Sequence, residues 1–243
     1  MMGHIFGEFL GVLIIVAFGE GVVANITLEK TIGHNAGSLY AQTAWGLAVM
    51  FGVTASLAVG GVGQLNPVFT IMAALISGDY SEVLPFIVAQ MAGGFCGAAL
   101  VWLLYLPHWG LADNPAGTLG VFCTAPGVRN LPLNGLTEFL ATLILCVLAS
   151  AIASKGFAGT NGLPQGFGTY LVGMLIWGIG MSFGGPTGYA LNPARDLAPR
   201  LAHAILPIEG KGGSDWGYAI VPVVGPMAAG VVAAGLVKLI GLA

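Results

Sequence analysis

The sequence predicts an all-α membrane protein with six transmembrane helices and two re-entrant half-helices, an inverted repeat of two three-span units around a central pore. Three observations support this fold class. The chain is 56% hydrophobic and only 7% charged, whereas a soluble domain carries about 25% charged residues. Three uncharged runs, 31–78, 83–112 and 156–194, can each hold at least one span of roughly 20 residues. Finally, the two halves of the chain resemble each other.

The expected spans follow one another along the chain as apolar runs at roughly 4–25, 38–59, 83–106, 134–154, 166–184 and 217–240. Two shorter apolar pieces, 67–77 and 193–205, each follow an Asn-Pro pair. Asn is a strong helix N-cap and Pro is favoured at the first helical position, so each pair predicts a helix start. A helix of the length of 67–77 is about 16 Å long, and two stacked end to end would match a hydrocarbon core of about 30 Å.

Internal similarity divides the chain into a first repeat (1–110), a connecting loop (111–133) and a second repeat (134–243). The recurring motifs are Glu-Phe-Leu at 8–10 and 138–140, Trp-Gly at 45–46 and 177–178, and Gly-Gly at 60–61 and 184–185. Each repeat has an odd number of spans, so the second copy must insert upside down. The half-helices should therefore enter from opposite faces and meet near the midplane. A third Asn-Pro pair, at 114–115, lies in the polar connecting loop, and we expect no half-helix after it.

The two Asn-Pro boxes are Asn66-Pro67-Val68 and Asn192-Pro193-Ala194. Half-helices that start there would aim backbone N–H donors and positive dipole ends at one point. An Asn amide can donate to a passing water or hydroxyl oxygen without presenting a full charge. The pattern favours a selective pore for small neutral solutes.

Extended stretches precede both boxes, and their glycines permit the backbone to turn carbonyl oxygens towards the pore. These stretches are Val62-Gly63-Gln64 and Gly188-Tyr189-Ala190. Arg195 is the one strong charge in the central motifs, and an intramembrane Arg is costly and marks function. It would donate to solute hydroxyls and repel cations and protons. Glu20 has no counterpart in the other repeat, and we expect it at the membrane interface.

Other function classes find less support. The chain has no phosphate-binding Walker loop and no nucleophile–base constellation, so we expect neither an enzyme nor a cofactor. Three cysteines without metal-ligand spacing predict no metal site, and the net charge of −3 gives no nucleic-acid signal. An ion-coupled transporter could also use inverted repeats, but matched carboxylates at Glu8 and Glu138 are explained more simply as a structural pair. A mainly structural membrane protein is the remaining alternative.

The paired boxes, the run Asn192-Pro193-Ala194-Arg195-Asp196, the Glu-Phe-Leu repeats and the six-span plan resemble the aquaporin (major intrinsic protein) family over essentially the whole chain. The chain looks most like the aquaglyceroporin, or glycerol facilitator, branch, because Asp196 follows Arg195, Arg200 comes four residues later and Pro222-Val223 falls in the last span. The resemblance implies a passive channel for glycerol and water that excludes ions and protons. It also implies a homotetramer in the cell membrane, with the lipid bilayer as its surroundings.

Carried over by motif, the resemblance implies a selectivity filter of Trp45, Gly180, Tyr189 and Arg195. Water-selective members have His at the Gly180 position, and a glycine there would leave a wider opening. The resemblance also implies that Glu8 and Glu138 hold the re-entrant loops, and that Asp196 braces the loop beside Arg195.

Three residues depart from the family pattern: Gln64 replaces His, Val68 replaces Ala, and Tyr189 replaces Phe. They leave open a channel tuned to another small neutral solute, namely water alone, hydrogen peroxide, urea or protonated lactic acid.

Overall fold

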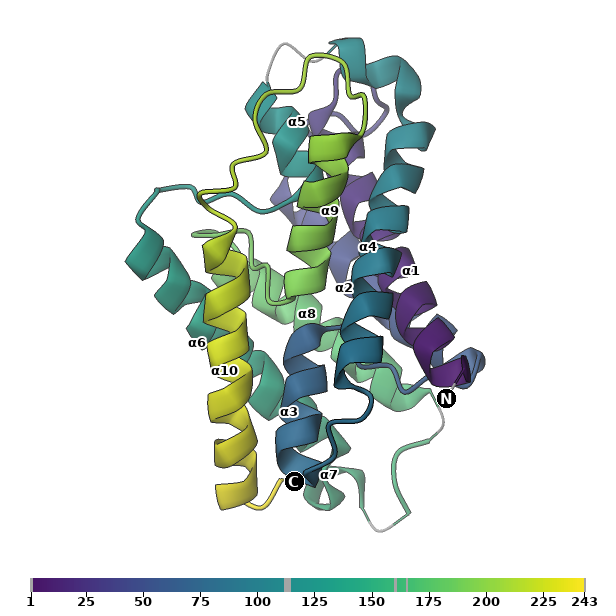
Figure 1. Ribbon diagram of the computed structural model, residues 1–243, viewed down its shortest axis with the longest axis vertical. Coiled ribbons are helices and arrows are strands. Elements are labelled where there is room, and N and C mark those ends of the chain that lie inside the picture. The colour runs from purple at the N-terminus through teal and green to yellow at the C-terminus, as the bar shows by residue number, and fades with distance from the viewer. Residues whose placement is uncertain (1, 112–114, 160, 165, 243) are drawn as a thin grey trace.

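The computed structural model describes residues 2–111, 115–159, 161–164 and 166–242, which fold into a helical bundle (Figure 1). Its elements are α1 (Met2–Thr27), α2 (Ser38–Ala58), α3 (Pro67–Ser77), α4 (Val83–Leu104), the 3₁₀ helix η1 (Leu106–Leu111), α5 (Pro115–Phe122), α6 (Leu131–Ala153), α7 (Lys155–Ala158), α8 (Phe167–Phe183), α9 (Pro193–Ile205) and α10 (Ile220–Leu239).

Among the described residues, five helices are long and apolar enough to cross a bilayer alone, namely α1, α2, α4, α6 and α10. The sixth span, α8, has 17 residues, which corresponds to about 25 Å. All six lie within a few residues of the expected apolar runs. The predicted fold class of six spans and two re-entrant half-helices is confirmed.

The two half-helices, α3 and α9, stack end to end in the interior of the bundle (Figure 1). α9 packs on α4, and α3 packs on α10 and α4. Around them, α1 packs against α2 and α4, α2 against α8, and α6 against α10. The surrounding spans therefore shield two helices that are each too short to cross the membrane.

Local capping chemistry explains where the half-helices begin. Asn66 Oδ1 accepts the Val68 N–H at 2.9 Å, and Asn192 Oδ1 accepts the Ala194 N–H at 3.0 Å. The proline that follows each Asn lacks an N–H and has a helical φ, so it begins the helix without an unsatisfied donor.

The connecting segment is more helical than expected. We expected no half-helix after the third Asn-Pro pair, but a short helix, α5, does begin at Pro115 and runs to Phe122. Asn114 itself lies outside the described residues. Phe122 is fully buried and its ring packs at a tilt against Trp109 of η1, with ring centroids 5.5 Å apart. α6 begins at Leu131 rather than 134, because the Asn130 side chain accepts the Leu133 N–H at 3.2 Å and caps it.

Candidate functional site

A cavity of about 360 Å³ lies where the half-helices meet. Its wall follows α2 from Trp45 to Val53, follows α6 from Leu145 to Ala153, and includes the backbone stretches 63–66 and 189–192. We call the end beside Trp45 and Arg195 the filter end, and the end beside Ile76 and Ala153 the far end. Most of the wall is apolar, so the few polar groups on it determine which solutes it can hold.

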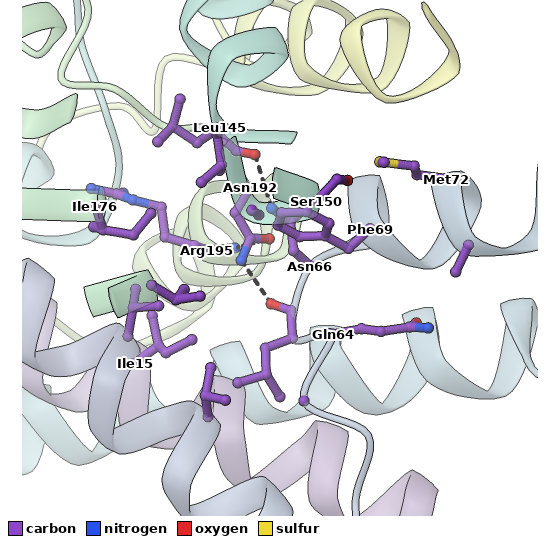
Figure 2. Close-up of a pocket in the computed structure, with 18 of the residues that line it drawn as sticks. Ile15, Gln64, Asn66, Phe69, Met72, Leu145, Ser150, Ile176, Asn192 and Arg195 are labelled. Atoms are coloured by element: carbon purple, nitrogen blue, oxygen red, sulfur yellow. Dashed lines mark hydrogen bonds between the residues drawn. The ribbon is translucent and has the colours of Figure 1, made fainter. Parts of the chain in front are cut away.

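The two Asn side chains lie next to each other on the wall of this cavity (Figure 2). Asn66 Nδ2 donates to the Leu191 carbonyl at 3.0 Å, and Asn192 Nδ2 donates to the Leu65 carbonyl at 2.8 Å. These crossed bonds tie each half-helix to the loop that precedes the other. An amide carries two N–H donors, so each Asn keeps a second donor for a molecule in the cavity.

Two leucines next to the boxes adopt left-handed backbone conformations. Leu65 has φ 54° and Leu191 has φ 56°, each directly before its Asn. This region is unfavourable for a non-glycine residue and persists only where the surroundings enforce it, commonly at functional sites. The sequence carries no local signal for it, because a glycine would be the expected residue.

In the first repeat, Glu8 holds Leu65 in this left-handed conformation. This fully buried carboxylate accepts the Gln64 N–H at 2.9 Å and the Leu65 N–H at 2.6 Å. Gln90 Nε2 also donates to Glu8, at 2.7 Å, and to Thr70 Oγ1 at 3.0 Å. The re-entrant stretch is thereby held to α1 and α4 on the side away from the cavity.

Glu138 repeats the arrangement in the second half of the chain. It is 1% exposed and accepts the Ala190 N–H at 2.9 Å and the Leu191 N–H at 3.0 Å. Each re-entrant stretch is thus bonded to one buried carboxylate through two backbone N–H groups.

The backbone stretches that line the cavity differ in part from the expected ones. Gly63, Gln64, Tyr189 and Ala190 line it, but Val62 and Gly188 do not, and the lining continues to residues 65–66 and 191–192. Pro67, Val68, Pro193 and Ala194 lie behind the lining, in the first turns of α3 and α9.

At the filter end the Arg195 guanidinium stacks on the ring of Trp45, with Cζ 4.0 Å from the ring centroid. Both residues line the cavity and both are buried, with Arg195 8% exposed. Stacking on the indole face stabilises the cation without a direct carboxylate contact.

Tyr189 occupies the space that Gly180 leaves free. A Cβ at Gly180 would fall 2.9 Å from both Cζ and Oη of Tyr189, and one at Gly184 would fall 2.6 Å from Tyr189 Cδ1. Gly180, in the last turn of α8, and Gly184, directly after that helix, therefore leave room for the phenol ring to pack flat against the backbone. Gly180 does not itself line the cavity, and Tyr189 does. The Tyr189 hydroxyl is buried and has no hydrogen-bond partner among the described residues.

Asp196 lies behind the filter end in a buried network that sequence reasoning only partly found. Its Oδ2 accepts the Thr124 N–H at 2.7 Å and the Thr124 hydroxyl at 2.6 Å. Its Oδ1 accepts Arg200 Nη2 at 2.9 Å. Arg200 also donates to the carbonyls of Thr124, Ser214 and Asp215. No sequence motif predicts the contact of Thr124 with Asp196, since only the fold brings the connecting segment to α9.

Glu20 does not lie at the membrane interface, as we expected, but inside the protein. It is fully buried, and neither carboxylate oxygen has a hydrogen-bond partner in the described part of the chain. It lies within electrostatic range of Arg195 and Asp196. The position on α1 is one turn beyond Val16, on the face that packs inward, and charge alone did not reveal that.

The sequence model of one family, described as major intrinsic protein, matches residues 1–237. The chain belongs to the major intrinsic protein family. A probable glycerol uptake facilitator protein of Thermotoga maritima is 48% identical over 230 residues, 94% of this chain and 95% of the relative. The glycerol uptake facilitator protein of Bacillus subtilis is 45% identical over 233 residues, 94% of this chain and 81% of the relative.

The X-ray structure of the aquaglyceroporin from Plasmodium falciparum has a TM-score of 0.85 to this fold at 29% identity, covering 100% of this chain and 99% of that chain. Membership of this family makes the protein a multi-pass membrane channel and not an enzyme.

Proposed function

We propose that this member of the major intrinsic protein family is a passive channel for glycerol and water that excludes ions and protons. The observation that carries the proposal is the pair of Asn amides in the cavity, each with one N–H bonded to the opposite loop and one left for a solute. Similarity to glycerol uptake facilitators supports glycerol as the polyol.

In this proposal Arg195, Trp45, Tyr189 and Gly180 form the selectivity filter. Arg195 donates to solute hydroxyls, while the faces of Trp45 and Tyr189 contact the carbon chain. Gly180 affects the filter through Tyr189, because the absence of a side chain at Gly180 leaves the space that the phenol ring occupies. A polyol has hydroxyls along one edge and C–H groups along the other, so one polar wall and one apolar wall suit it.

Beyond the filter, the carbonyls of 63–65 and 189–191 accept hydrogen bonds from the solute on the polar wall. Apolar side chains form the opposite wall, among them Val49, Phe69 and Ile176. A solute that gives up water in such a passage must find partners for each polar group, because an unsatisfied group costs several kcal/mol. Glu8, Glu138 and Asp196 keep the backbone segments that carry these carbonyls in position without contacting the solute.

Ion exclusion follows from the same geometry in this proposal. Two half-helix N-termini and the Arg195 guanidinium place positive potential along the passage. A cation would lose its hydration shell and meet that potential, so its barrier is high. For a neutral solute, the barrier comes only from the hydrogen bonds to water that the wall does not replace.

The organisation of the chain also belongs to the proposal. Residues 1–110 and 134–243 act as two repeats joined by 111–133, and four copies assemble with one pore in each subunit. Large apolar side chains are exposed along the spans, for example Leu84, Val88 and Leu133, and they fit contacts with lipid or with another subunit. Native mass spectrometry of the detergent-solubilised protein tests the assembly, and a monomer as the only species would contradict it.

Flux measurements in proteoliposomes test the channel. Light scattering under glycerol and water gradients should show fast, unsaturable flux with a low temperature dependence and no coupling to pH. Arg195→Ala should raise cation and proton leak by about tenfold or more, since about 1.4 kcal/mol off a barrier is a factor of ten. Lys30→Ala is the control, because Lys30 is exposed and lies outside the cavity lining. Slow, saturable uptake that requires an ion gradient would overturn the proposal.

A further inference from the structure

Glu20 is a buried titratable residue that the proposed channel does not use. It lies on α1, is fully buried, and is not part of the cavity lining. Neither carboxyl oxygen has a hydrogen-bond partner among the described residues, whereas Glu8 and Glu138 each accept two backbone N–H groups. A buried carboxyl group without a partner costs free energy. The stability of the fold therefore does not account for this residue, and a function can.

Glu20 lies behind the filter end, next to the contact between α1 and Trp45. The preceding residue, Gly19, is so close to Trp45 that a Cβ there would overlap the indole ring. The same indole carries the Arg195 guanidinium on its face, with Cζ 4.0 Å from the ring centroid. Glu20 behind the wall and Arg195 on the wall are within electrostatic range of each other.

Arg195 has no ion-pair partner among the described residues. The carboxylate next to it in the chain, Asp196, forms its ion pair with Arg200 instead, at 2.9 Å. Glu138 is also within electrostatic range of Arg195, but its two oxygens accept backbone N–H groups. In the described chain, Glu20 is thus the carboxyl group near Arg195 that no other group holds.

The elements packed on α1 add no other counter-charge in the part of the chain that the structure describes. α1 packs mainly on α2, α4, α5 and α9, and the first three contain no Asp, Glu, Lys, Arg or His. α9 carries His203 besides the three charged residues named above, and His203 Nδ1 is bonded to Ser214 Oγ at 2.9 Å. Cys123, directly after α5, is a buried free thiol within electrostatic range of Glu20. Protonation of Glu20 therefore changes the local net charge by one unit beside an unpaired cation.

The rejection of anions needs a group of this kind. In the proposed channel, the half-helix N-termini and Arg195 place positive potential along the passage, and this potential rejects cations. The same potential attracts small anions. A carboxylate behind Arg195 lowers that attraction without occupying the passage, and its field reaches the wall because salt screens buried charges little.

We propose that the Glu20 carboxyl group sets the net charge of the filter end, and thereby determines how strongly the channel rejects small anions. When it is ionised, it balances Arg195, and an anion gains little on entering the passage. When it is protonated, Arg195 is unbalanced and anions leak through. Glu20 acts through the field at Arg195 and does not contact the solute. The inference rests on the proposed function, since it concerns ion exclusion in the same passage.

Chloride leak into proteoliposomes, measured as a function of pH, tests this role. The liposomes contain a dye that chloride quenches, and potassium with valinomycin carries the balancing charge. The leak above that of protein-free liposomes should rise about tenfold from about pH 8.5 to about pH 5, a range in which buried carboxyl groups titrate. A tenfold change is the equivalent of about 1.4 kcal/mol, the order expected for one charge a few ångströms from another near a protein surface.

Variants at position 20 assign the pH dependence to this carboxyl group. Glu20→Gln has nearly the same shape and is always neutral, so its chloride leak should equal the acidic wild-type value at every pH. Glu20→Met is a second neutral variant and should behave in the same way. Glu20→Asp retains a carboxyl group and should retain the pH dependence. The matched control is Glu29→Gln, which removes an exposed carboxylate just after α1 and should give the wild-type profile.

Glycerol permeability of the same preparations separates this inference from the proposed function. It should stay at the wild-type level in Glu20→Gln, because no group on the cavity lining is lost. A wild-type chloride leak that does not change with pH, or a pH dependence that persists in Glu20→Gln, overturns the role of Glu20 and leaves a glycerol channel in place. A parallel loss of glycerol permeability in both neutral variants also overturns it, since it indicates a change of shape at Trp45. The expected chloride profiles in a protein that conducts no glycerol would support the role of Glu20 and overturn the proposed solute.

Discussion

At the residue scale, the contact between Gly180 and Tyr189 sets the shape of the filter end. A methyl group at Gly180 would fall 2.9 Å from the phenol ring, which is closer than van der Waals contact allows. We expect Gly180→Ala to push Tyr189 into the passage and to reduce glycerol permeability more than water permeability, with an overpacking strain of about 1–3 kcal/mol.

The control for this substitution lies on the same helix. A Cβ at Gly178 has no atom within 4 Å, so Gly178→Ala should leave both fluxes unchanged. Stopped-flow light scattering on both variants makes the comparison. If Gly180→Ala conducted glycerol as well as the wild type, the position of the Tyr189 ring would not limit glycerol permeability. A His at position 180 should act in the same way and more strongly, because its ring needs the space that Tyr189 occupies.

Glu20 gives a second prediction at this scale. Its carboxyl group is fully buried and has no partner in the described chain, and such burial costs free energy whether the group is charged or neutral. Glu20→Met has a similar length and no polar atom, so we expect it to raise the free energy of unfolding by about 1–3 kcal/mol.

Thermal unfolding in detergent measures that change, with Glu29→Met at an exposed carboxylate as the control. A lower unfolding temperature for Glu20→Met would mean that a bound water or a direct interaction with Arg195 stabilises the native carboxyl group.

At the scale of elements, the two re-entrant stretches depend on the carboxylates behind them. Glu138 accepts two backbone N–H groups, from Ala190 and Leu191. In Glu138→Gln one of these donors would face an NH₂ group instead of an oxygen. We expect the free energy of unfolding to fall by about 1–3 kcal/mol, the usual cost of a buried group that loses its partner.

Glu8→Gln should have a larger effect, because Gln90 also donates to Glu8. Chemical denaturation of both variants beside Glu29→Gln measures the difference. Equal stability of Glu8→Gln, Glu138→Gln and the control would show that the bonds contribute nothing net.

At the scale of the whole molecule, an ion pair joins the connecting segment to the loop before α10 near the filter end. Arg129 donates to both oxygens of Asp215, at 2.7 and 2.9 Å. These hydrogen bonds from Arg129 lower the pKa of Asp215 below its usual value. The folded state therefore gains stability from this pair above the ordinary Asp pKa of about 3.9, and loses it as the pH falls through the lowered pKa.

We accordingly expect the unfolding temperature to fall as the pH drops from about 5 to about 3, and the fall to be smaller in Asp215→Asn. The effect should be modest, because Arg129 is half exposed and solvent screens the pair. An identical pH profile in wild type and variant would show that the pair does not hold the loops together.

The starts of the half-helices could be predicted to the residue, because an Asn cap and a following Pro are local chemistry. The six spans could be placed to within a few residues, because apolar length is also local. The hydrophobic run predicts the start of α6 three residues too late, because the Asn130 cap and not hydrophobicity sets that start. α5 was missed because its helical state depends on packing: Phe122 is buried against Trp109.

The burial of Glu20 and the contacts of Thr124 with Asp196 depend on segments far apart in the chain. The position of Tyr189 over Gly180 depends on how the chain turns back onto α8 after that helix ends. No pattern within one segment encodes such contacts, and a resemblance by motif names positions without their geometry. By itself the sequence determined which stretches enter the bilayer and where the short helices begin, because hydrophobic length and capping act within a few residues. Only the tertiary structure decided which polar groups remain unpaired on the passage wall, because satisfying a hydrogen bond requires two groups that folding brings together.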